Sequence, residues 1–531
     1  MKVFKYITIT AGLILTAACN DLDLAPIDYN GSGNFWKNEA QVVGAIEGVH
    51  SQFRSNSFNY WILGEARGGT MVPGGTSSLE QNIYYADIKQ QNFTADKPNN
   101  SSWFEFYGKI FNINNAIKNI EEASYLSPAN KSYYLGQMYG MRAWYYFWLY
   151  RTYGGVPLKT GTEILDKTPT SGKELFTPRS TPKATFDFIK ADINRSETHF
   201  TDSNKVNCFD RVHRSYYATL MLKAEIYLWS AKVTTGDQAP AATDLDTAKA
   251  ALDKVVTSGK FSLMSNYADV FAYNKKQNNE IIFAMAHLEN EASTPFNSFM
   301  YYPSSFVNKY DEDGVAFPNN DPLKIQSGFL FNEYKFELFE AFDATDTRRA
   351  KTFLSFYANA AKTQGRGIAL IKYMGFINSA NTRVFADDIP VYRYADVLLM
   401  YAEIINKQGN QNPRMLTIIK PSVRLTQSDN VRARFNSSNA YTHTTFAASE
   451  LAILKERDKE FVAESKRWFD VRRLQDASGQ PLVFSREASY GTVAGNVVPI
   501  LNQGSEAHKL LWPINKDIIS RDETVTQTPG Y

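Results

Sequence analysis

Cysteine, histidine and net charge are all scarce in this 531-residue chain. It holds two cysteines, Cys19 and Cys208, six histidines, and 57 Lys and Arg against 55 Asp and Glu. A formal charge of +2 provides no basic stripe, so we expect no nucleic-acid partner. The histidines are dispersed without metal-ligand spacing, so we expect no metal site and no cofactor. Scattered loop Asp and Asn residues leave a structural cation undecided.

Familiar catalytic motifs are also missing. The sequence has no HExxH metalloprotease motif, no GxxxxGK[ST] phosphate loop and no GxSxG nucleophile elbow. A carboxylate pair for glycoside hydrolysis stays open, because the separation of such a pair is spatial and not sequential. An exported glycoside hydrolase is therefore kept as an alternative, and the expectation that the protein is not an enzyme comes from the family resemblance given below.

The first residues, MKVFKYITITAGLILTAAC, place two lysines before a short apolar stretch, 7–18. This stretch is too short to cross a bilayer core of about 30 Å and is typical of a signal peptide. Small residues directly before Cys19 resemble a bacterial lipoprotein signal, in which the cysteine carries lipid and becomes the mature N-terminus. We expect a signal peptide over 1–18, lipid on Cys19 and an extended tether over 19–33. An ordinary secretory signal cleaved nearby is the alternative.

If Cys19 carries lipid, Cys208 has no partner and no intramolecular disulfide forms. The stability of this exported chain must then come from burial.

Aromatic residues are abundant, at 14% of the chain, and they concentrate in MRAWYYFWLYRTYGGVPL, residues 141–158. Read as a helix, this segment is apolar almost all round, which indicates a core helix and not a ligand surface. Only Arg142, Tyr146 and Arg151 remain for polar partners or water. Gly154 and the following Gly and Pro predict the end of the helix.

Helical patterns dominate the chain, and any strands are expected to be short and local. We expect helices over residues 102–123, 131–153, 181–199, 212–232, 244–258, 390–408 and 447–474. Small residues face large ones four positions away, as in Ala143–Phe147, Ala224–Leu228 and Leu398–Ala402, which suits closely stacked helical hairpins. This packing is typical of tetratricopeptide repeats, although the spacing is irregular. The fold class is therefore mainly α, with a repeat-like scaffold.

The charged run KERDKEFVAESKRWFDVRRL, residues 455–474, could suggest a catalytic acid with an arginine clamp. Its charged members lie three or four positions apart, which predicts mutual ion pairs along one helix. Leu454, Phe461 and Trp468 form the expected apolar seam opposite. The charged members are Glu460, Glu464, Arg467, Asp470 and Arg473.

Several segments together resemble the SusD/RagB family of outer-membrane lipoproteins. They are NFWKNEAQVVGAIEGVHSQF, MRAWYYFWLYRTYGGVPL, TPRSTPKATFDFIKADI, SYYATLMLKAEIYLWSA, IPVYRYADVLLMYAEIIN, LAILKERDKEFVAESKRWFDVRRL and LLWPINKDIISRDETVTQTPGY, in the order of the family. The sequence departs from the family at Asn515, where Pro is usual, and at Thr528, where Asn is usual.

The resemblance implies one SusD-like domain over residues 34–531, behind the lipid anchor. Its expected parts are helical hairpins over 34–260, a loop-rich insertion over 261–389 and C-terminal signatures over 390–531. It also implies a place on the outer membrane at the cell surface, and a TonB-dependent transporter of the SusC type as partner. The chain would capture a glycan, or a peptide as in RagB-like members, and pass it to the transporter unchanged.

Binding residues are expected on loops, where aromatic faces meet the apolar surfaces of sugar rings. The family's binding region corresponds here to 67–93 and 296–317. From the first we select Arg67, Tyr84 and Tyr85. From the second we select Tyr301, Tyr302 and Asn308. The alternative for each aromatic is packing against the scaffold, and for Arg67 it is a surface or structural ion pair.

Three classes of function remain: a nutrient-binding lipoprotein, an exported enzyme, and an interaction protein without a small ligand. Saturable binding without product would indicate the first. Turnover at a close carboxylate pair would indicate the second, and a stable transporter complex without ligand the third.

Overall fold

The structure is a computed structural model that describes residues 35–72, 83–100, 102–166, 169–296, 306–317, 323–325, 332–409, 431, 445–491 and 497–531. The side chains of residues 83–85, 102 and 166 are not among those described. The expected signal peptide, Cys19 and the tether therefore lie outside the described residues.

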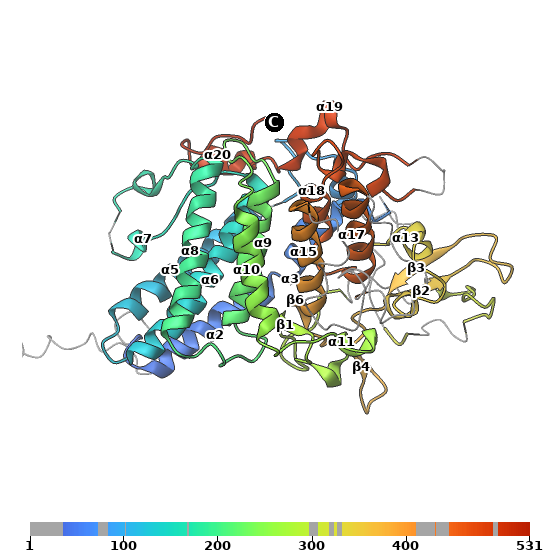
Figure 1. Ribbon diagram of the computed structural model, residues 1–531, viewed down its shortest axis with the longest axis horizontal. Helices are drawn as coiled ribbons and strands as arrows, with labels where there is room; N and C mark the ends of the chain where they lie inside the picture. The colour runs from blue at the N-terminus through green and yellow to red at the C-terminus, as the bar shows by residue number, and fades with distance from the viewer. Residues whose placement is uncertain are drawn as a thin grey trace, which may run out of the picture.

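Helical hairpins build the N-terminal part, as the sequence predicts. Figure 1 shows α8, α9 and α10 side by side, with α5 and α6 beside them. The closest packing joins α6 to α5 and α8, and α9 to α10. These helices are α2 (Glu39–Ser55), α5 (Ser102–Glu122), α6 (Pro128–Tyr153), α8 (Pro182–Asp202), α9 (Tyr216–Lys232) and α10 (Asp244–Thr257).

The aromatic helix α6 is a core element, which confirms its interpretation from sequence. Every residue from Tyr134 to Tyr153 is buried. Arg142 donates hydrogen bonds of 2.6 and 2.9 Å to Asp192, so this cation finds its partner inside the protein. The helix ends at Gly154, whose φ of +78° is open to glycine at little cost.

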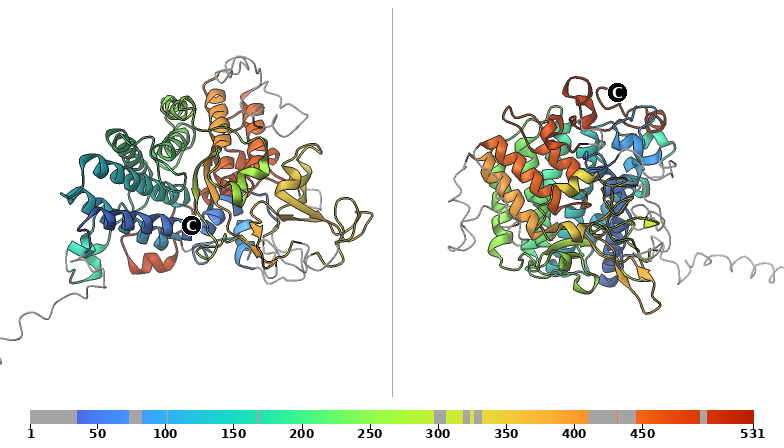
Figure 2. Two further views of the ribbon diagram at one scale, coloured as in Figure 1. Left: turned by 90° about the horizontal axis from the view of Figure 1, so that it is seen from below. Right: turned by 90° about the vertical axis from the view of Figure 1, so that its right-hand side faces the viewer.

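A second helical group is formed by α15 (Tyr394–Lys407), α17 (Phe446–Glu460) and α18 (Arg467–Arg473). Seen from below, this group lies beside the N-terminal hairpins, and the β2–β3 segment projects at the far end (Figure 2). One main cluster of buried hydrophobic side chains runs from Val42 to Val525 and so includes both groups.

The strands are short, as expected, but the expectation that they are local is wrong for β1 and β6, which come from distant parts of the chain. β1 (Ile281–Met285) pairs antiparallel with β6 (Ile389–Arg393), in a register that sets Ile281 opposite Arg393. The helix expected from residue 390 is therefore wrong over its first four residues, because backbone pairing with β1 holds them extended. Two further hairpins are β2 (Phe353–Phe356) with β3 (Gly367–Leu370), and β4 (Phe376–Ile377) with β5 (Arg383–Val384).

Short helical segments connect these parts. A π-helix, η1, spans Ile62–Ala66 directly after α3. The other short segments are α3 (Ser57–Trp61), α4 (Ile83–Lys89), α7 (Glu163–Asp166), η2 (Gly172–Leu175), α11 (Tyr267–Phe271), η3 (Tyr273–Lys275), α13 (Phe336–Glu340), α14 (Arg349–Thr352), η6 (Leu482–Phe484), η7 (Arg486–Ala488), α19 (Gln503–Glu506), η8 (Ala507–Leu510) and α20 (Lys516–Arg521).

The continuous helix expected over 447–474 is also wrong. It ends at Glu460 and resumes at Arg467, and Ala463 and Ser465 between them adopt φ of +61° and +62°. The break places residues 461–466 against η1, where a Cβ on Gly64 would lie 2.0 Å from the carbonyl oxygen of Ser465. Tertiary contact has overridden a strong local helical pattern here.

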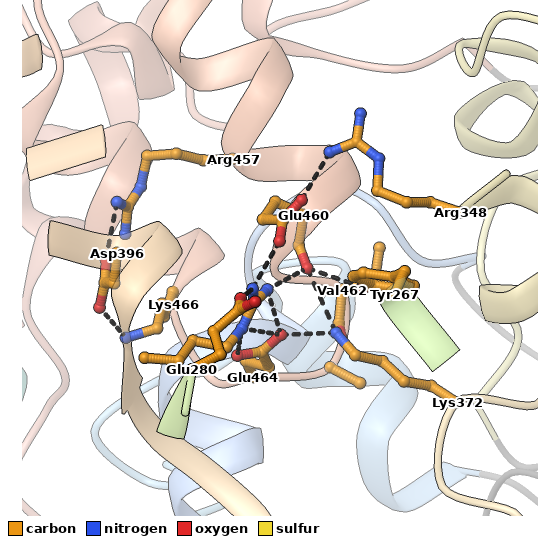
Figure 3. A network of polar contacts seen from close by, with 12 residues as sticks. Tyr267, Glu280, Arg348, Lys372, Asp396, Arg457, Glu460, Val462, Glu464 and Lys466 are labelled. Carbon is orange, nitrogen blue, oxygen red and sulfur yellow. Dashed lines mark hydrogen bonds and ion pairs between the residues drawn. The ribbon is translucent and has the colours of Figure 1, made fainter. Parts of the chain in front are cut away.

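The acidic side chains at this break are buried and pair with distant segments. Glu460 contacts Arg348 at 2.6 Å, and Glu464 contacts Arg393 at 2.9 Å and Lys372 at 2.6 Å. Figure 3 shows the labelled Arg348 and Lys372 reaching Glu460 and Glu464 from other elements.

The expectation of mutual pairing along one helix holds for Asp470 and Arg473 of α18, which lie 3.0 Å apart. It needs correction for Glu460 and Glu464, whose partners come from other parts of the fold. The role of the charged run is therefore structural, because its buried carboxylates join several segments of the fold.

A histidine near the start of α9 gives the fold a predicted pH dependence. The Nδ1 of His213 lies 2.6 Å from Asp210, and its Nε2 lies 3.0 Å from Glu47. The hydrogen bond to Asp210, with a further one to Glu47, raises the pKa of His213 to about 9. A raised folded-state pKa stabilises the protein fully below the unfolded value of about 6.5, and this contribution is lost as pH rises through 9.

We therefore expect His213→Asn to lower the melting temperature most at pH 6 and hardly at all above pH 10. Melting curves of both proteins between pH 6 and 10 would test this. A difference that stays constant over the range would contradict it.

Candidate ligand-binding site

The first expected binding region is fixed at its base to the central insertion. Met71 forms an isolated antiparallel bridge with Tyr334. The Val72 amide donates to the Glu333 carbonyl at 2.9 Å, and the Lys335 amide donates to the Thr70 carbonyl at 2.8 Å. This bridge therefore fixes the first region to the central insertion, although Met71 and Tyr334 lie 263 positions apart in the sequence.

Tyr84 and Tyr85 lie on helix α4 and not on an irregular loop, and their side chains lie outside the described ones. The helix ends at Lys89, which is buried and donates to the Asn332 side chain at 3.4 Å. Burial lowers the pKa of Lys89 to about 8, and the nearby Glu333 carboxylate opposes this shift. Contact with residues 332 and 333 thus holds α4 against the central insertion.

The second expected region is anchored by a buried phenylalanine. Phe306 packs edge-on against Phe317 and Phe356, with ring centroids 5.4 and 5.6 Å apart. Two residues later, Asn308 is exposed and has a φ of +52°, a conformation that Asn tolerates better than most residues. Tyr301 and Tyr302 lie outside the described residues.

Both regions are linked to the β2–β3 hairpin, the first through Tyr334, which bridges to Met71 and packs against Phe353, and the second through Phe306. Phe356 of β2 pairs with Gly367 of β3. A Cβ on Gly367 would lie 2.7 Å from the Glu333 carboxylate and closer still to the Phe356 ring. Glu333, which follows the residue that contacts α4, thus lies beside Gly367 of β3, and Phe306 packs against Phe356 of β2. The described anchors of the two segments therefore lie beside the same hairpin, which no local sequence signal indicates.

Arg67 lies in the core and not at the surface. It is 0% exposed, and its guanidinium lies over the rings of Phe93, Trp468 and Trp512 at 4.6, 3.9 and 4.9 Å. It donates to the Gln91 side chain at 2.8 Å and also to the Lys509 carbonyl. This burial lowers its pKa. The geometry argues against ligand contact by Arg67, and it shows cation–π packing in place of the structural ion pair.

A groove with an exposed aromatic residue lies elsewhere, between α5, α7 and α20. Its volume is about 390 Å³, and Phe104 and Ile164 at its wall are 51% and 53% exposed. The Arg521 guanidinium lies 5.9 Å from the Phe104 ring centroid. The sequence predicts only a scaffold helix over 102–123, and nothing in its pattern distinguishes Phe104 as exposed.

Within the described ranges, no group of three or more His, Cys, Asp or Glu side chains is placed to hold a metal ion. In that same part of the chain, no helix is both long enough and apolar enough to cross a membrane.

Comparison with known proteins gives a consistent result along the chain. The sequence pattern described as "SusD family" matches residues 257–531, and the pattern described as "Starch-binding associating with outer membrane" matches 59–228. A SusD-like protein, P38, from Formosa agariphila is 26% identical over 517 residues, which cover 90% of this chain and 93% of that protein.

Solved structures agree with this assignment. The crystal structure of a SusD superfamily protein from Bacteroides fragilis is 37% identical, with a TM-score of 0.83, and the match covers 94% of this chain and all of the other. Surface glycan-binding protein A from Bacteroides thetaiotaomicron, solved with laminarihexaose, shares the fold at 17% identity and a TM-score of 0.62, over 92% of this chain and 99% of that one. The family resemblance and the mainly α fold are thereby confirmed, and the chain belongs to the SusD family.

Proposed function

We propose that this protein is a lipid-anchored glycan-binding protein of the outer-membrane surface, and that it captures an oligo- or polysaccharide without transforming it. Family membership over most of the chain is the observation that carries this proposal. A fold relative in complex with laminarihexaose supports a glycan as the ligand class. Cys19 is the proposed lipidation site, and residues 34–531 form the proposed single SusD-like domain.

The proposed partner is a TonB-dependent transporter of the SusC type, to which the captured glycan is delivered. This follows from family membership and from the outer-membrane association named for the family. A peptide ligand, as in RagB-like members, is the alternative within the same binding role.

The proposed binding site comprises Tyr84, Tyr85, Tyr301, Tyr302 and Asn308. The described anchors of both segments lie beside the β2–β3 hairpin, and Asn308 is exposed. Arg67 is left out because its guanidinium is enclosed by three aromatic rings. Aromatic faces stacked on sugar rings, with an amide at the rim, suit a neutral glycan.

Affinity electrophoresis tests this proposal. The mature chain without lipid, residues 20–531, is run through gels that contain plant, host or microbial polysaccharides. We expect one polymer to retard the protein, and the double variant Tyr84→Ala with Tyr301→Ala to bind it about tenfold more weakly or worse, because each lost aromatic contact costs roughly 0.5–1.5 kcal/mol beyond its buried area. No sugar should be released during incubation.

Phe104→Ala serves as the matched control, since it removes an exposed aromatic ring far from the β2–β3 hairpin. Loss of binding in this variant, with the tyrosine variant unaffected, would move the site to the α5–α20 groove. Released sugar would indicate a hydrolase. Retardation by no polymer, with binding of a peptide mixture, would favour the RagB-like alternative.

A further inference from the structure

The largest cavity among those described lies away from the β2–β3 hairpin, where the ends of several helices meet the C-terminal segment. Its volume is about 750 Å³, within the range usual for small-molecule sites. Its walls come from the C-terminal ends of α6, α9 and α18, from the residues before α8, and from residues 503–511 and 526–529. Figure 1 shows α19 and the C-terminus at this end, with β2 and β3 well to the side.

The charge of the lining is one-sided. Among the described residues that line the cavity there is no Asp or Glu, whereas Arg179, Lys232 and Arg472 are present. The charge of Lys232 is already balanced by two carboxylates that do not line the cavity, Glu403 at 2.7 Å and Glu450 at 2.6 Å. The two arginines therefore decide the electrostatic character of the cavity.

Arg472 is a buried cation without an acidic partner. It is 3% exposed, and one nitrogen donates to the Arg151 carbonyl at 2.6 Å. Within the described chain its other guanidinium nitrogens make no hydrogen bond and no ion pair. Burial, and then the charge of Arg151, lower the pKa of Arg472 to about 9. Burying a charge without a counter-charge costs several kcal/mol, so an anion in the cavity would relieve that cost.

Arg179 lies on the same cavity and is also without an acidic partner in the described structure. It donates to the carbonyls of Gly155 and Tyr153 at 2.7 and 2.6 Å, and to that of Thr526 at 3.0 Å. These bonds fix the guanidinium in place. Because each of its three guanidinium nitrogens already donates to a carbonyl, Arg179 contributes a fixed positive charge to the cavity wall, and Arg472 is left as the arginine with free donors.

The rim offers groups of another kind. Thr234, Gln480 and Gln503 line the cavity and are exposed. Gln503 donates to Gln480 at 3.1 Å, which leaves the amide nitrogen of Gln480 and the side-chain carbonyl of Gln503 to bond with hydroxyl groups. Between the rim and the arginines, the cavity wall includes apolar residues such as Val233 and Pro481. Hydroxyl-binding amides above apolar walls and a cationic floor match a hydroxyl-rich ligand with one negative group.

We propose that this cavity is a second ligand site, and that it binds a short saccharide carrying a carboxylate, with Arg472 as the main contact of that carboxylate. The site is separate from the tyrosine site on the other segments. Either site can therefore fail its test without affecting the other.

Isothermal titration calorimetry on the mature chain tests the proposal. The probes are disaccharides that contain glucuronate or galacturonate, the neutral disaccharides of the same linkage, and inorganic sulfate. We expect at least one acidic disaccharide to bind ten times more tightly than its neutral counterpart, and its affinity to fall as salt concentration rises.

Variants at the exposed Thr234 keep the test independent of folding. Thr234→Glu places a negative charge at the rim and is expected to weaken the acidic disaccharide at least fivefold, whereas the neutral, similarly sized Thr234→Gln stays within twofold of the wild type. Arg472→Met should abolish the binding, and its melting temperature shows whether it folds. The tyrosine double variant should bind the acidic disaccharide normally.

Several outcomes would overturn the proposal. Equal affinity for acidic and neutral disaccharides would remove the role of charge, and no binding of any acidic probe would remove the site. Binding of sulfate alone would show an inorganic-anion site in place of a saccharide site. Equal weakening by Thr234→Glu and Thr234→Gln would place the ligand elsewhere.

Discussion

Replacing Arg393 by methionine is expected to lower the free energy of unfolding by about 3–5 kcal/mol, the usual cost of removing one partner from a buried ion pair. Arg393 contacts Glu280 at 2.7 Å and Glu464 at 2.9 Å, and it also pairs with Glu460. All four side chains are 0% exposed. Without the guanidinium, three buried carboxylates share fewer positive partners, and Glu280 loses its contact with the cation entirely.

Urea denaturation followed by tryptophan fluorescence measures this effect. Arg486→Met is the control, because Arg486 is exposed and such changes usually stay within about 0.5 kcal/mol. In a double-mutant cycle, Glu464→Gln should cost less in the Arg393→Met background than in the wild type, because Glu464 has then already lost Arg393 and keeps only its ion pair with Lys372. A loss below 1 kcal/mol for Arg393→Met would show that the network contributes little to stability.

Replacing Arg67 by alanine is expected to destabilise the protein by about 2–4 kcal/mol, because it opens a cavity between three rings and leaves one buried and one partly buried acceptor without their donor. The rings are those of Phe93, Trp468 and Trp512, and the acceptors are the Gln91 side chain and the Lys509 carbonyl. The affinity of the folded variant for the retarding glycan should stay within about twofold of the wild type, since a one-kcal change would already exceed that.

Melting curves and gel retardation, measured on the same preparation, separate the two roles of Arg67. Gln90→Ala is a suitable control, because Gln90 is exposed and is next to Gln91 in the sequence, but it is not one of the residues that contact the Arg67 guanidinium. Native stability together with a tenfold loss of glycan affinity would restore Arg67 as a ligand contact. Loss of stability alone would confirm it as a clamp between the first binding segment and the C-terminal part.

Local patterns predicted the scaffold well. The observed bounds of α5, α8 and α10 lie within about three residues of those expected, because apolar periodicity and end signals are local. Thr181, for example, accepts a hydrogen bond from the Ala184 amide at 3.1 Å, the N-cap contact that precedes a helix beginning with Pro. The interpretation of α6 as a core helix depended only on which of its faces were apolar.

Predictions failed where distant segments compete with local propensity. Residues 390–393 are extended because β1 pairs with them, and the helix expected through 461–466 is broken where it meets Gly64 and Lys372. Charge spacing in the 455–474 run indicated ion pairs but not the partners of Glu460 and Glu464, which are residues 348, 372 and 393. Spacing along a helix carries no information about such contacts.

For the candidate sites too, the sequence indicated which segments are involved but not how distant residues arrange them. The sequence located the segments that carry Tyr84 and Asn308, because loop composition and family order are visible in it. It did not show that Phe306 and Glu333 lie beside one hairpin, that Phe104 is exposed, or that Arg472 faces a cavity without an acidic partner.

The sequence by itself therefore determined the family, the mainly α fold and the helices of the scaffold, since each is encoded in motifs and periodicities within a few tens of residues. Only the tertiary structure decided which polar side chains are enclosed and which reach a surface. Burial and charge pairing depend on contacts between residues far apart in the chain, and for Arg67 and Arg472 these contacts separate a structural clamp from a proposed anion site.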